Sequence, residues 1–201
     1  MRAVVLNCSL KGGDTPSNTQ MLTDHVLAEL ASYDVTSQVF RLADLTIPPG
    51  VETDMGGGDE WPRVHDALVA SEILIVATPT WVGRPSSLAQ RALERMDAML
   101  SETDDHERPV AYNRVAGVVV TGNEDGAHHV ISEMAGGLGD IGYTIPAQAF
   151  TYWNMGPGPG PDYSDTDHGH DYAEKTGRAM AANLAGVARA LAANPLGPPP
   201  E

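Results

Sequence analysis

Three short runs of consecutive apolar residues constrain the fold of this chain more than any other feature. They are Val4-Val5-Leu6, Ile73-Leu74-Ile75-Val76 and Val118-Val119-Val120. Runs of this length that do not alternate with polar residues are typical of strands in a parallel sheet, because helices cover both faces of such a sheet. We therefore expect these segments to include the central strands of a parallel sheet.

Strand-like and helix-like segments alternate along the whole chain. The predicted strands cover residues 3–8, 35–40, 73–78, 115–121 and 143–150. The predicted helices cover residues 19–32, 61–70, 87–100, 127–141 and about 171–193. Five βα repeats with short connections indicate an α/β fold with right-handed crossovers. We expect a doubly wound five-stranded parallel sheet with helices on both faces, and the spacing leaves the strand order open.

The length of the chain fits one domain of this kind. The sequence has 201 residues, of which we assign 1–193 to a single domain and 194–201 to a disordered Pro-rich tail. Residues 1–2 lead directly into the first predicted strand, and no apolar run approaches the ~18 residues of a membrane span. We expect a cytoplasmic protein without a targeting segment.

Charge and cysteine content exclude several classes of protein. With 12 Lys and Arg against 27 Asp and Glu, the net charge is −15, which repels nucleic acid and anionic membranes. We expect neither as a partner. Cys8 is the only cysteine, so the chain can form neither an internal disulfide nor a four-cysteine metal site, and a reducing compartment fits best.

The connection after the first strand, residues 8–19, has the composition of an anion site. It combines hydroxyl groups, glycines and Lys11 immediately before the predicted helix. A helix N-terminus offers free amides and a favourable dipole to a phosphate, and Ser and Thr hydroxyls add further donors. A phosphate site is therefore predicted here, against the alternative of an ordinary capped helix with a polar entry loop.

Spacing excludes three common phosphate-binding motifs in this loop. A Walker loop requires Gly-Lys-Ser/Thr after a glycine and four further residues, but Ser17 and Asn18 follow the four residues after Gly12. A dinucleotide turn requires G-x-G-x-x-G, and this loop has only two adjacent glycines. A cysteine phosphatase of this topology requires Arg six residues after its cysteine, where this chain has Asp14. Cys8 is therefore expected to be a buried structural residue.

A second loop, residues 78–87, follows the third predicted strand. In a doubly wound sheet, loops that leave the carboxyl ends of neighbouring strands flank the ligand crevice, so this loop should face the first. Trp81 can cover an aromatic ring, Gly83 allows close backbone approach, and two prolines stiffen the segment. The alternative is a rigid turn with Trp81 packed in the core.

These motifs together resemble the flavodoxin-like NADPH-dependent FMN reductase family. The hydroxyl-rich loop 9–19 is followed, after one βα unit, by Thr-Pro-Thr-Trp-Val-Gly at 78–83 and by Val-Val-Thr-Gly-Asn at 119–123. The resemblance covers about residues 1–153. It implies the strand order 2-1-3-4-5, a bound FMN, and NADPH or NADH as the electron donor.

The resemblance also assigns residues to the FMN site. For the phosphate it implies the residues of the first loop, Ser9, Lys11, Ser17, Asn18 and Thr19. For the isoalloxazine ring it implies Pro79, Thr80, Trp81, Val82 and Gly83. For the pyrimidine edge it implies Thr121, Gly122, Asn123 and Gly126. His129 either hydrogen-bonds the flavin or faces solvent. No metal site is predicted, because the His and Asp residues of 165–171 lack ligand spacing.

The predicted function is that of an FMN-dependent NAD(P)H oxidoreductase acting on a quinone, free flavin, azo or nitro compound. The FMN N5 atom carries the chemistry, so no catalytic side chain is required. The first alternative is a flavodoxin-type electron carrier, although the T/S-x-T-G-x-T loop typical of carriers is absent. The second is a flavin-free member of the fold, which Asp14 beside the phosphate loop would favour.

Two long Gly/Pro-rich segments, 48–59 and 154–167, are expected to be irregular and to act as a lid or a subunit contact. The family resemblance implies a homodimer or homotetramer. Arg84 is the candidate cation for a nicotinamide phosphate.

Overall fold

Five parallel strands and one short antiparallel strand form a single sheet in the computed structural model, which describes residues 1–199. The strands are β1 (Arg2–Asn7), β2 (Thr36–Arg41), β3 (Ile73–Trp81), β4 (Arg84–Pro85), β5 (Val115–Gly122) and β6 (Phe150–Asn154). The strand order is β2-β1-β3-β5-β6, and β4 pairs only with β3. For the five long strands this is the order 2-1-3-4-5, so the predicted flavodoxin-like sheet is confirmed.

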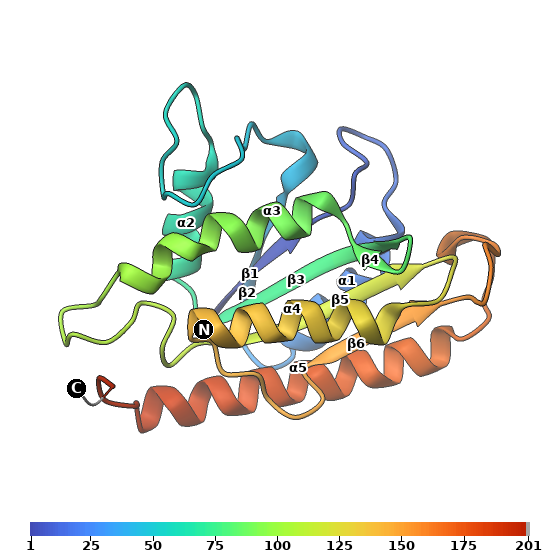
Figure 1. Ribbon diagram of the computed structural model, residues 1–201. Helices are drawn as coiled ribbons and strands as arrows, with labels where there is room; N and C mark the ends of the chain where they lie inside the picture. The colour runs from blue at the N-terminus through green and yellow to red at the C-terminus, as the bar shows by residue number, and fades with distance from the viewer. Residues whose placement is uncertain (200–201) are drawn as a thin grey trace.

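Five α-helices cover the two faces of the sheet (Figure 1). They are α1 (Asn18–Ala31), α2 (Trp61–Val69), α3 (Ser87–Met96), α4 (Ala127–Ile141) and α5 (His170–Ala193). Three short 3-10 helices are η1 (Leu42–Asp44), η2 (Asp97–Ser101) and η3 (Tyr163–Asp165). Helices α2, α3 and α4 pack on one face, and α1 and α5 pack on the other. Among residues 1–199, no helix has the length and apolar character needed to cross a membrane.

The side chains of each central strand alternate between two apolar layers. In β1, Val4 and Leu6 contact the layer beneath α2, α3 and α4, whereas Ala3 and Val5 contact the layer beneath α1 and α5. Both faces of the strand are therefore apolar, which explains the continuous apolar runs in the sequence.

Cys8 lies at the end of β1 and is fully buried. Its Sγ donates a hydrogen bond to the Leu6 carbonyl, and burial raises the pKa of the thiol above its ordinary value. A buried thiol that stays protonated is a poor nucleophile. The structure therefore agrees with a structural role for this cysteine.

The prediction for the last strand was wrong. The sequence suggested a strand at 143–150, but β6 covers Phe150–Asn154, and the earlier segment contributes only one bridge, between Thr144 and Val115. Pro146 has no amide proton to donate, and Gln148 has a φ of 52°, so neither residue continues a sheet. Residues 87–100 also form less α-helix than predicted, because α3 ends at Met96 and continues as η2.

The tail after α5 has no helix or strand over residues 194–199, and 200–201 lie outside the described residues. The Leu196 amide donates to Asn113 Oδ1 at 2.7 Å, and Asn113 Nδ2 donates to the Leu196 carbonyl at 3.2 Å. This part of the tail therefore contacts the loop that precedes β5, at the end of the sheet opposite the strands' carboxyl ends.

Candidate functional site

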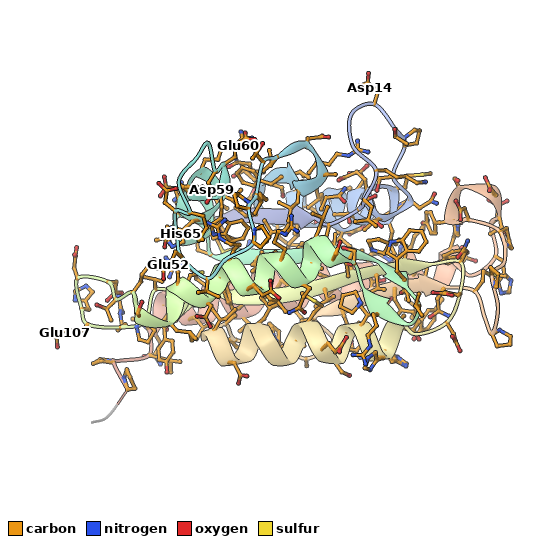
Figure 2. All side chains as sticks on the ribbon, turned by 45° about the horizontal axis from the view of Figure 1, so that its top comes forward. Asp14, Glu52, Asp59, Glu60, His65 and Glu107 are labelled. Carbon is orange, nitrogen blue, oxygen red and sulfur yellow. The ribbon has the colours of Figure 1, made fainter. Side chains whose placement is uncertain are left out.

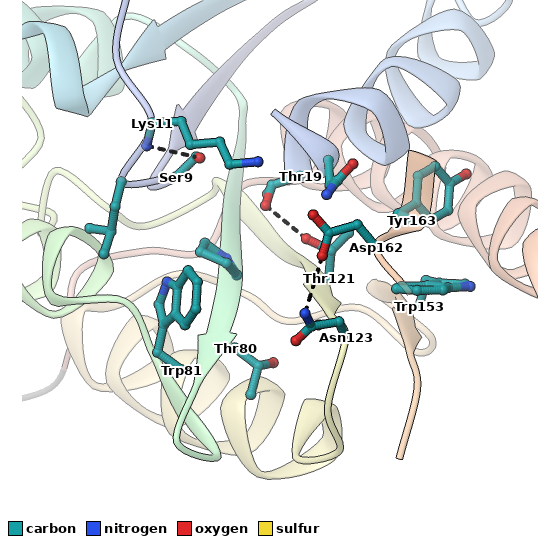
Figure 3. Close-up of a pocket in the computed structure, with 14 residues that line it drawn as sticks. Ser9, Lys11, Thr19, Thr80, Trp81, Thr121, Asn123, Trp153, Asp162 and Tyr163 are labelled. Atoms are coloured by element: carbon teal, nitrogen blue, oxygen red, sulfur yellow. Dashed lines mark hydrogen bonds between the residues drawn. The ribbon is translucent and has the colours of Figure 1, made fainter. Parts of the chain in front are cut away.

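A pocket opens at the carboxyl ends of the parallel strands, where the three predicted loops meet (Figure 3). Ten of its lining residues were predicted from the sequence: Ser9, Lys11, Asn18, Thr19, Pro79, Thr80, Trp81, Thr121, Gly122 and Asn123. The other lining residues are Leu10, Trp153, Asp162 and Tyr163. The doubly wound topology brings these loops together, because β1, β3 and β5 are adjacent and point the same way.

The first loop enters α1 through a capped N-terminus. Ser17 is the N-cap residue, and its Oγ accepts a hydrogen bond from the Gln20 amide at 3.2 Å. The amides of Asn18 and Thr19 precede the first intrahelical hydrogen bonds and are free to donate to a ligand. Lys11 adds an ammonium group at the same wall of the pocket. These groups form the donor set that a phosphate needs.

The second loop is a tight hairpin between β3 and β4. Trp81 pairs with Arg84, so only two residues form the turn. These are Val82, with a φ of 53°, and Gly83, with a φ of 71°. Positive φ at both central residues is the requirement of a type I′ turn. The hairpin holds Trp81 at the mouth of the pocket with half of its surface exposed, and not in the core.

Beside Trp81, Thr80 lines the pocket, and its hydroxyl has no protein partner within residues 1–199. Its Oγ1 is buried and makes no hydrogen bond to any described residue. A buried hydroxyl is normally hydrogen-bonded, so this atom lacks a partner that the described residues do not supply. The neighbouring glycines allow close packing here, since a Cβ on Gly126 would lie 2.9 Å from the Gly83 Cα.

The third loop is fixed by the segment that follows β6. Asn123 Nδ2 donates to Asp162 Oδ1 at 3.2 Å, and the Asn123 carbonyl accepts from the Gly160 amide at 2.7 Å. The same segment reaches the first loop, because the Ser164 amide donates to Asn18 Oδ1 at 3.2 Å. Residues 155–165 therefore form a strap between the first and third loops.

The strap supplies pocket residues that the sequence did not reveal. Asp162 places a carboxylate among the polar groups (Figure 3), and Tyr163 and Trp153 pack edge to face with ring centroids 5.4 Å apart. Burial, together with the negative charge of Glu174, raises the pKa of the Tyr163 hydroxyl. The available signal was the Gly/Pro-rich composition of this segment, which predicted a lid or a subunit contact but no individual side chain.

Five of the predicted residues do not line the pocket: Ser17, Val82, Gly83, Gly126 and His129. The first four support the loops through the cap, turn and packing described above. His129 Nε2 lies 3.4 Å from the Glu133 carboxylate, on the exposed side of α4. Arg84 also pairs with Glu133, so the predicted nicotinamide cation is engaged on the protein surface.

The acidic residues raise two questions, namely whether Asp14 disturbs the pocket and whether any cluster could bind a metal ion. Asp14 lies at the exposed tip of the first loop, where it projects away from the body of the protein (Figure 2), so it does not place a negative charge in the pocket. Within residues 1–199, no three His, Cys, Asp or Glu side chains gather in a way that could hold a metal ion.

The pocket therefore fits a phosphorylated ligand with a flat aromatic ring. One wall offers helix amides, hydroxyls and an ammonium group, whereas the facing hairpin offers an indole ring and an orphan hydroxyl. Fold and site together define a flavodoxin-like protein with such a pocket at the carboxyl ends of its parallel strands.

Sequence comparison gives the family directly. The family model for NADPH-dependent FMN reductases matches residues 1–151, and the chain belongs to this family. It is thus a flavoprotein and a flavin-dependent oxidoreductase with FMN as its cofactor, as predicted, and the family name fits NADPH as the electron donor.

Two curated relatives match almost the whole chain. An 8-demethyl-8-aminoriboflavin-5'-phosphate synthase of Streptomyces davaonensis is 33% identical, with 97% of this chain and 80% of the relative covered. A divalent metal cation transporter MntH of Mycobacterium bovis is 32% identical over 96% of this chain, which spans only 29% of that protein.

A solved structure is similar over the same length. RosB, with the bound intermediate 8-demethyl-8-formylriboflavin-5'-phosphate, superposes with a TM-score of 0.88 at 32% identity, covering 98% of this chain and 82% of RosB. Other flavodoxin-like structures share only the fold, at 12% to 17% identity and TM-scores of 0.57 to 0.68.

Proposed function

We propose that the protein oxidises NADPH or NADH through FMN held in this pocket and passes the electrons to a small acceptor such as a quinone, free flavin, azo or nitro compound. The observation that carries the proposal is the convergence of all three predicted loops on one pocket. The FMN phosphate is assigned to the loop of Ser9, Lys11, Ser17, Asn18 and Thr19. The ring is assigned to the hairpin of 79–83 and the loop of 121–126.

The protein's task in this reaction is to bind and orient. FMN, when bound, supplies the hydride-accepting chemistry at its N5 atom. Trp81 offers its indole face to the ring, and the Thr80 hydroxyl and the amides of the hairpin are donors for the ring's polar edge. Thr121 and Asn123 offer polar groups on the opposite side. No general acid or base is required from the chain.

The structure supports an enzyme over an electron carrier in one respect. The pocket is open to solvent beside the half-exposed Trp81, so a second planar molecule has access to the ring site. An acidic carrier would also suit the net charge of −15, but it would not oxidise NADPH at an appreciable rate.

Pairing of two or more copies is part of the proposal. Leu10 and Trp81, which both line the pocket, are each about half exposed and leave large apolar surfaces at its mouth. Exposed apolar residues that cluster beside a site favour an interface. Sedimentation equilibrium should give a mass of two or four chains, and a monomer at micromolar concentration would contradict this part.

A second candidate reaction is chemical modification of the flavin itself. The family model ends at residue 151, whereas the 33% identity with the aminoriboflavin phosphate synthase extends over 97% of the chain. That longer match includes most of the segment that brings Asp162 and Tyr163 into the pocket. This observation favours FMN as a substrate as well as a cofactor.

One anaerobic experiment separates the reductase from the electron carrier. The purified protein is saturated with FMN and titrated with NADPH or NADH, and its visible spectrum is followed before and after an acceptor such as a benzoquinone is added. Rapid bleaching and recovery supports the reductase, whereas a flavin that NADPH and NADH leave oxidised contradicts it. The second candidate needs a separate aerobic incubation of the protein with FMN and an amino donor, followed by mass spectrometry of the released flavin, since modification changes the mass of FMN.

A further inference from the structure

One side chain from the edge strand holds the backbone of the phosphate loop. Arg41, the last residue of β2, donates from Nε to the Lys11 carbonyl at 2.8 Å and from Nη1 to the Gly13 carbonyl at 2.6 Å. Its Nη2 donates to the Thr15 carbonyl. Three alternate carbonyls of the loop therefore converge on a single guanidinium group, and Arg41 itself does not line the pocket.

Arg41 and Asp44 together form a clamp on this loop, in which Arg41 binds carbonyl groups and Asp44 binds an amide. Asp44 Oδ1 accepts a hydrogen bond from the Gly13 amide at 2.6 Å, and Asp44 Oδ2 lies 3.9 Å from Arg41 Nε. The fit is close, because a Cβ on Gly12 would lie 2.8 Å from Asp44 Oδ1. Arg41 and Asp44 together thus hold three carbonyls and one amide of the exposed part of the loop.

The clamp determines how the peptide groups of the loop are oriented. In a trans peptide the C=O and the following N–H point in opposite directions. Because the Lys11 and Gly13 carbonyls point at Arg41, the amides of Gly12 and Asp14 point away from it. The carbonyl oxygens, which would repel a phosphate, are turned to a cation outside the pocket.

Lys11 is fixed on both sides by these contacts. Its carbonyl is held by Arg41, and its amide donates to Ser9 Oγ at 3.3 Å. On the far side of the loop, the hydrogen bond to Thr15 anchors the chain two residues before the cap at Ser17. Arg41 therefore fixes both ends of the segment 11–15. This segment connects the two groups of predicted phosphate residues, Ser9 and Lys11 at or before its start and Ser17 to Thr19 after it.

We propose that Arg41 is a positioning residue for the FMN phosphate, acting through the backbone of residues 11–15 without touching the ligand. The inference rests on the proposed function, since it requires the phosphate to bind in this loop. A planar guanidinium with five N–H donors can hold several carbonyls at once, whereas a lysine ammonium is a compact point charge on a flexible stem. Arg41→Lys should therefore restore only part of what Arg41→Ala removes.

The test compares FMN with riboflavin, which has the same ring and no phosphate. Dissociation constants are measured by flavin fluorescence for the wild type, Arg41→Ala, Arg41→Lys and Arg189→Ala. Arg189 is an exposed residue of α5 that donates to the Tyr33 carbonyl, so its removal makes the same change in net charge far from the loop. Thermal unfolding of each variant checks that it is folded.

We expect Arg41→Ala to weaken FMN binding about tenfold, a loss of about 1.4 kcal/mol, and to change riboflavin binding less than twofold. Arg189→Ala should leave both constants unchanged. The double variant Arg41→Ala and Lys11→Ala should lose less FMN binding free energy than the two single variants together, because the two side chains act on one site.

The outcomes separate the two proposals. If the wild type prefers FMN to riboflavin and Arg41→Ala retains that preference in full, the Arg41 inference is wrong and the phosphate site stands. If Arg41→Ala weakens the binding of FMN and of riboflavin by the same factor, the inference is also wrong, because the substitution has then damaged the pocket as a whole. If the wild type binds neither flavin, or does not prefer FMN, the proposed phosphate site and the role of Arg41 both fail.

Discussion

The hydroxyl groups of Thr19 and Thr121 lie 2.8 Å apart in the wall of the pocket, although 102 residues separate them in the sequence. Thr19 lies in the first turn of α1, and Thr121 lies near the end of β5. This hydrogen bond joins the phosphate loop to the third loop, and it lies beneath the position that we propose for FMN.

Replacing Thr121 by Val should therefore weaken FMN binding. The substitution removes the bond to Thr19 and leaves a buried hydroxyl without its partner, which costs about 1–3 kcal/mol. We expect FMN affinity to fall on the order of tenfold, as measured by fluorescence titration. Thr176→Val is the matched control, because Thr176 makes a 2.8 Å hydroxyl contact with Thr151 outside the pocket. An equal loss of affinity in both variants would contradict this role.

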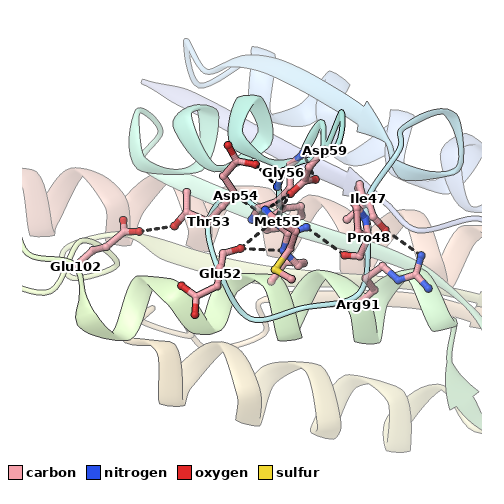
Figure 4. A network of polar contacts seen from close by, with 12 residues as sticks. Ile47, Pro48, Glu52, Thr53, Asp54, Met55, Gly56, Asp59, Arg91 and Glu102 are labelled. Carbon is pink, nitrogen blue, oxygen red and sulfur yellow. Dashed lines mark hydrogen bonds and ion pairs between the residues drawn. The ribbon is translucent and has the colours of Figure 1, made fainter.

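The segment 48–59 should respond to acid through a buried ion pair. Arg95 Nη2 lies 2.6 Å from Asp59 Oδ2, and both side chains are fully buried. The guanidinium also donates to the carbonyls of Pro48, Glu52 and Thr53. Figure 4 labels Asp59 and these three residues in the polar network of the segment. Burial alone would raise the pKa of Asp59, but the hydrogen bonds from Arg95 and from the amides of Met55 and Trp61 lower it to about 2.

A lowered carboxyl pKa stabilises the fold above the ordinary value of 3.8, and this stability is lost as the pH falls toward 2. Urea unfolding should therefore show a falling free energy of unfolding between about pH 4 and pH 2. Asp59→Asn should lower the free energy of unfolding by about 3–5 kcal/mol at neutral pH, because it leaves a buried arginine without its carboxylate partner. Asp140→Asn, on the exposed side of α4, serves as the control, and equal losses in the two variants would refute the account.

The hairpin that carries Trp81 should tolerate, and gain from, a change at Val82. This β-branched residue has a φ of 53° and is 90% exposed, so its side chain contributes little packing while its backbone is strained. Val82→Asn should raise the free energy of unfolding by about 0.5–1 kcal/mol, because Asn tolerates the left-handed region. Thermal unfolding checks this, and a destabilised variant would show that the Val82 side chain has a contact that outweighs the strain.

The sequence predicted the fold well where both faces of a strand are buried. The runs in β1, β3 and β5 have no polar alternation, so their position at the centre of the sheet follows from the apolar pattern. The last strand was misplaced because residues 143–150 have an apolar composition, while Pro146 and the positive φ of Gln148 prevent pairing there. Apolar composition alone does not report such backbone restrictions.

The site was predictable where it depends on loops that follow strands. Ser9, Thr80 and Thr121 were assigned from motifs, and all three line one pocket. Asp162 and Arg41 were not assigned, because each reaches the site region through contacts with residues far away in the sequence. Nothing in the local sequence around either residue indicates these contacts.

The most direct test of the account is the affinity for FMN of the double variant Ser17→Ala and Trp81→Ala. The first change removes the cap of α1 at the phosphate loop, and the second removes the ring that flanks the pocket mouth. The control is Ser132→Ala with Tyr172→Ala, which removes an exposed serine hydroxyl and an exposed aromatic ring outside the pocket. The account predicts a loss of FMN affinity of at least about tenfold in the first variant and none in the control. Unchanged FMN affinity in the Ser17 and Trp81 variant would contradict it.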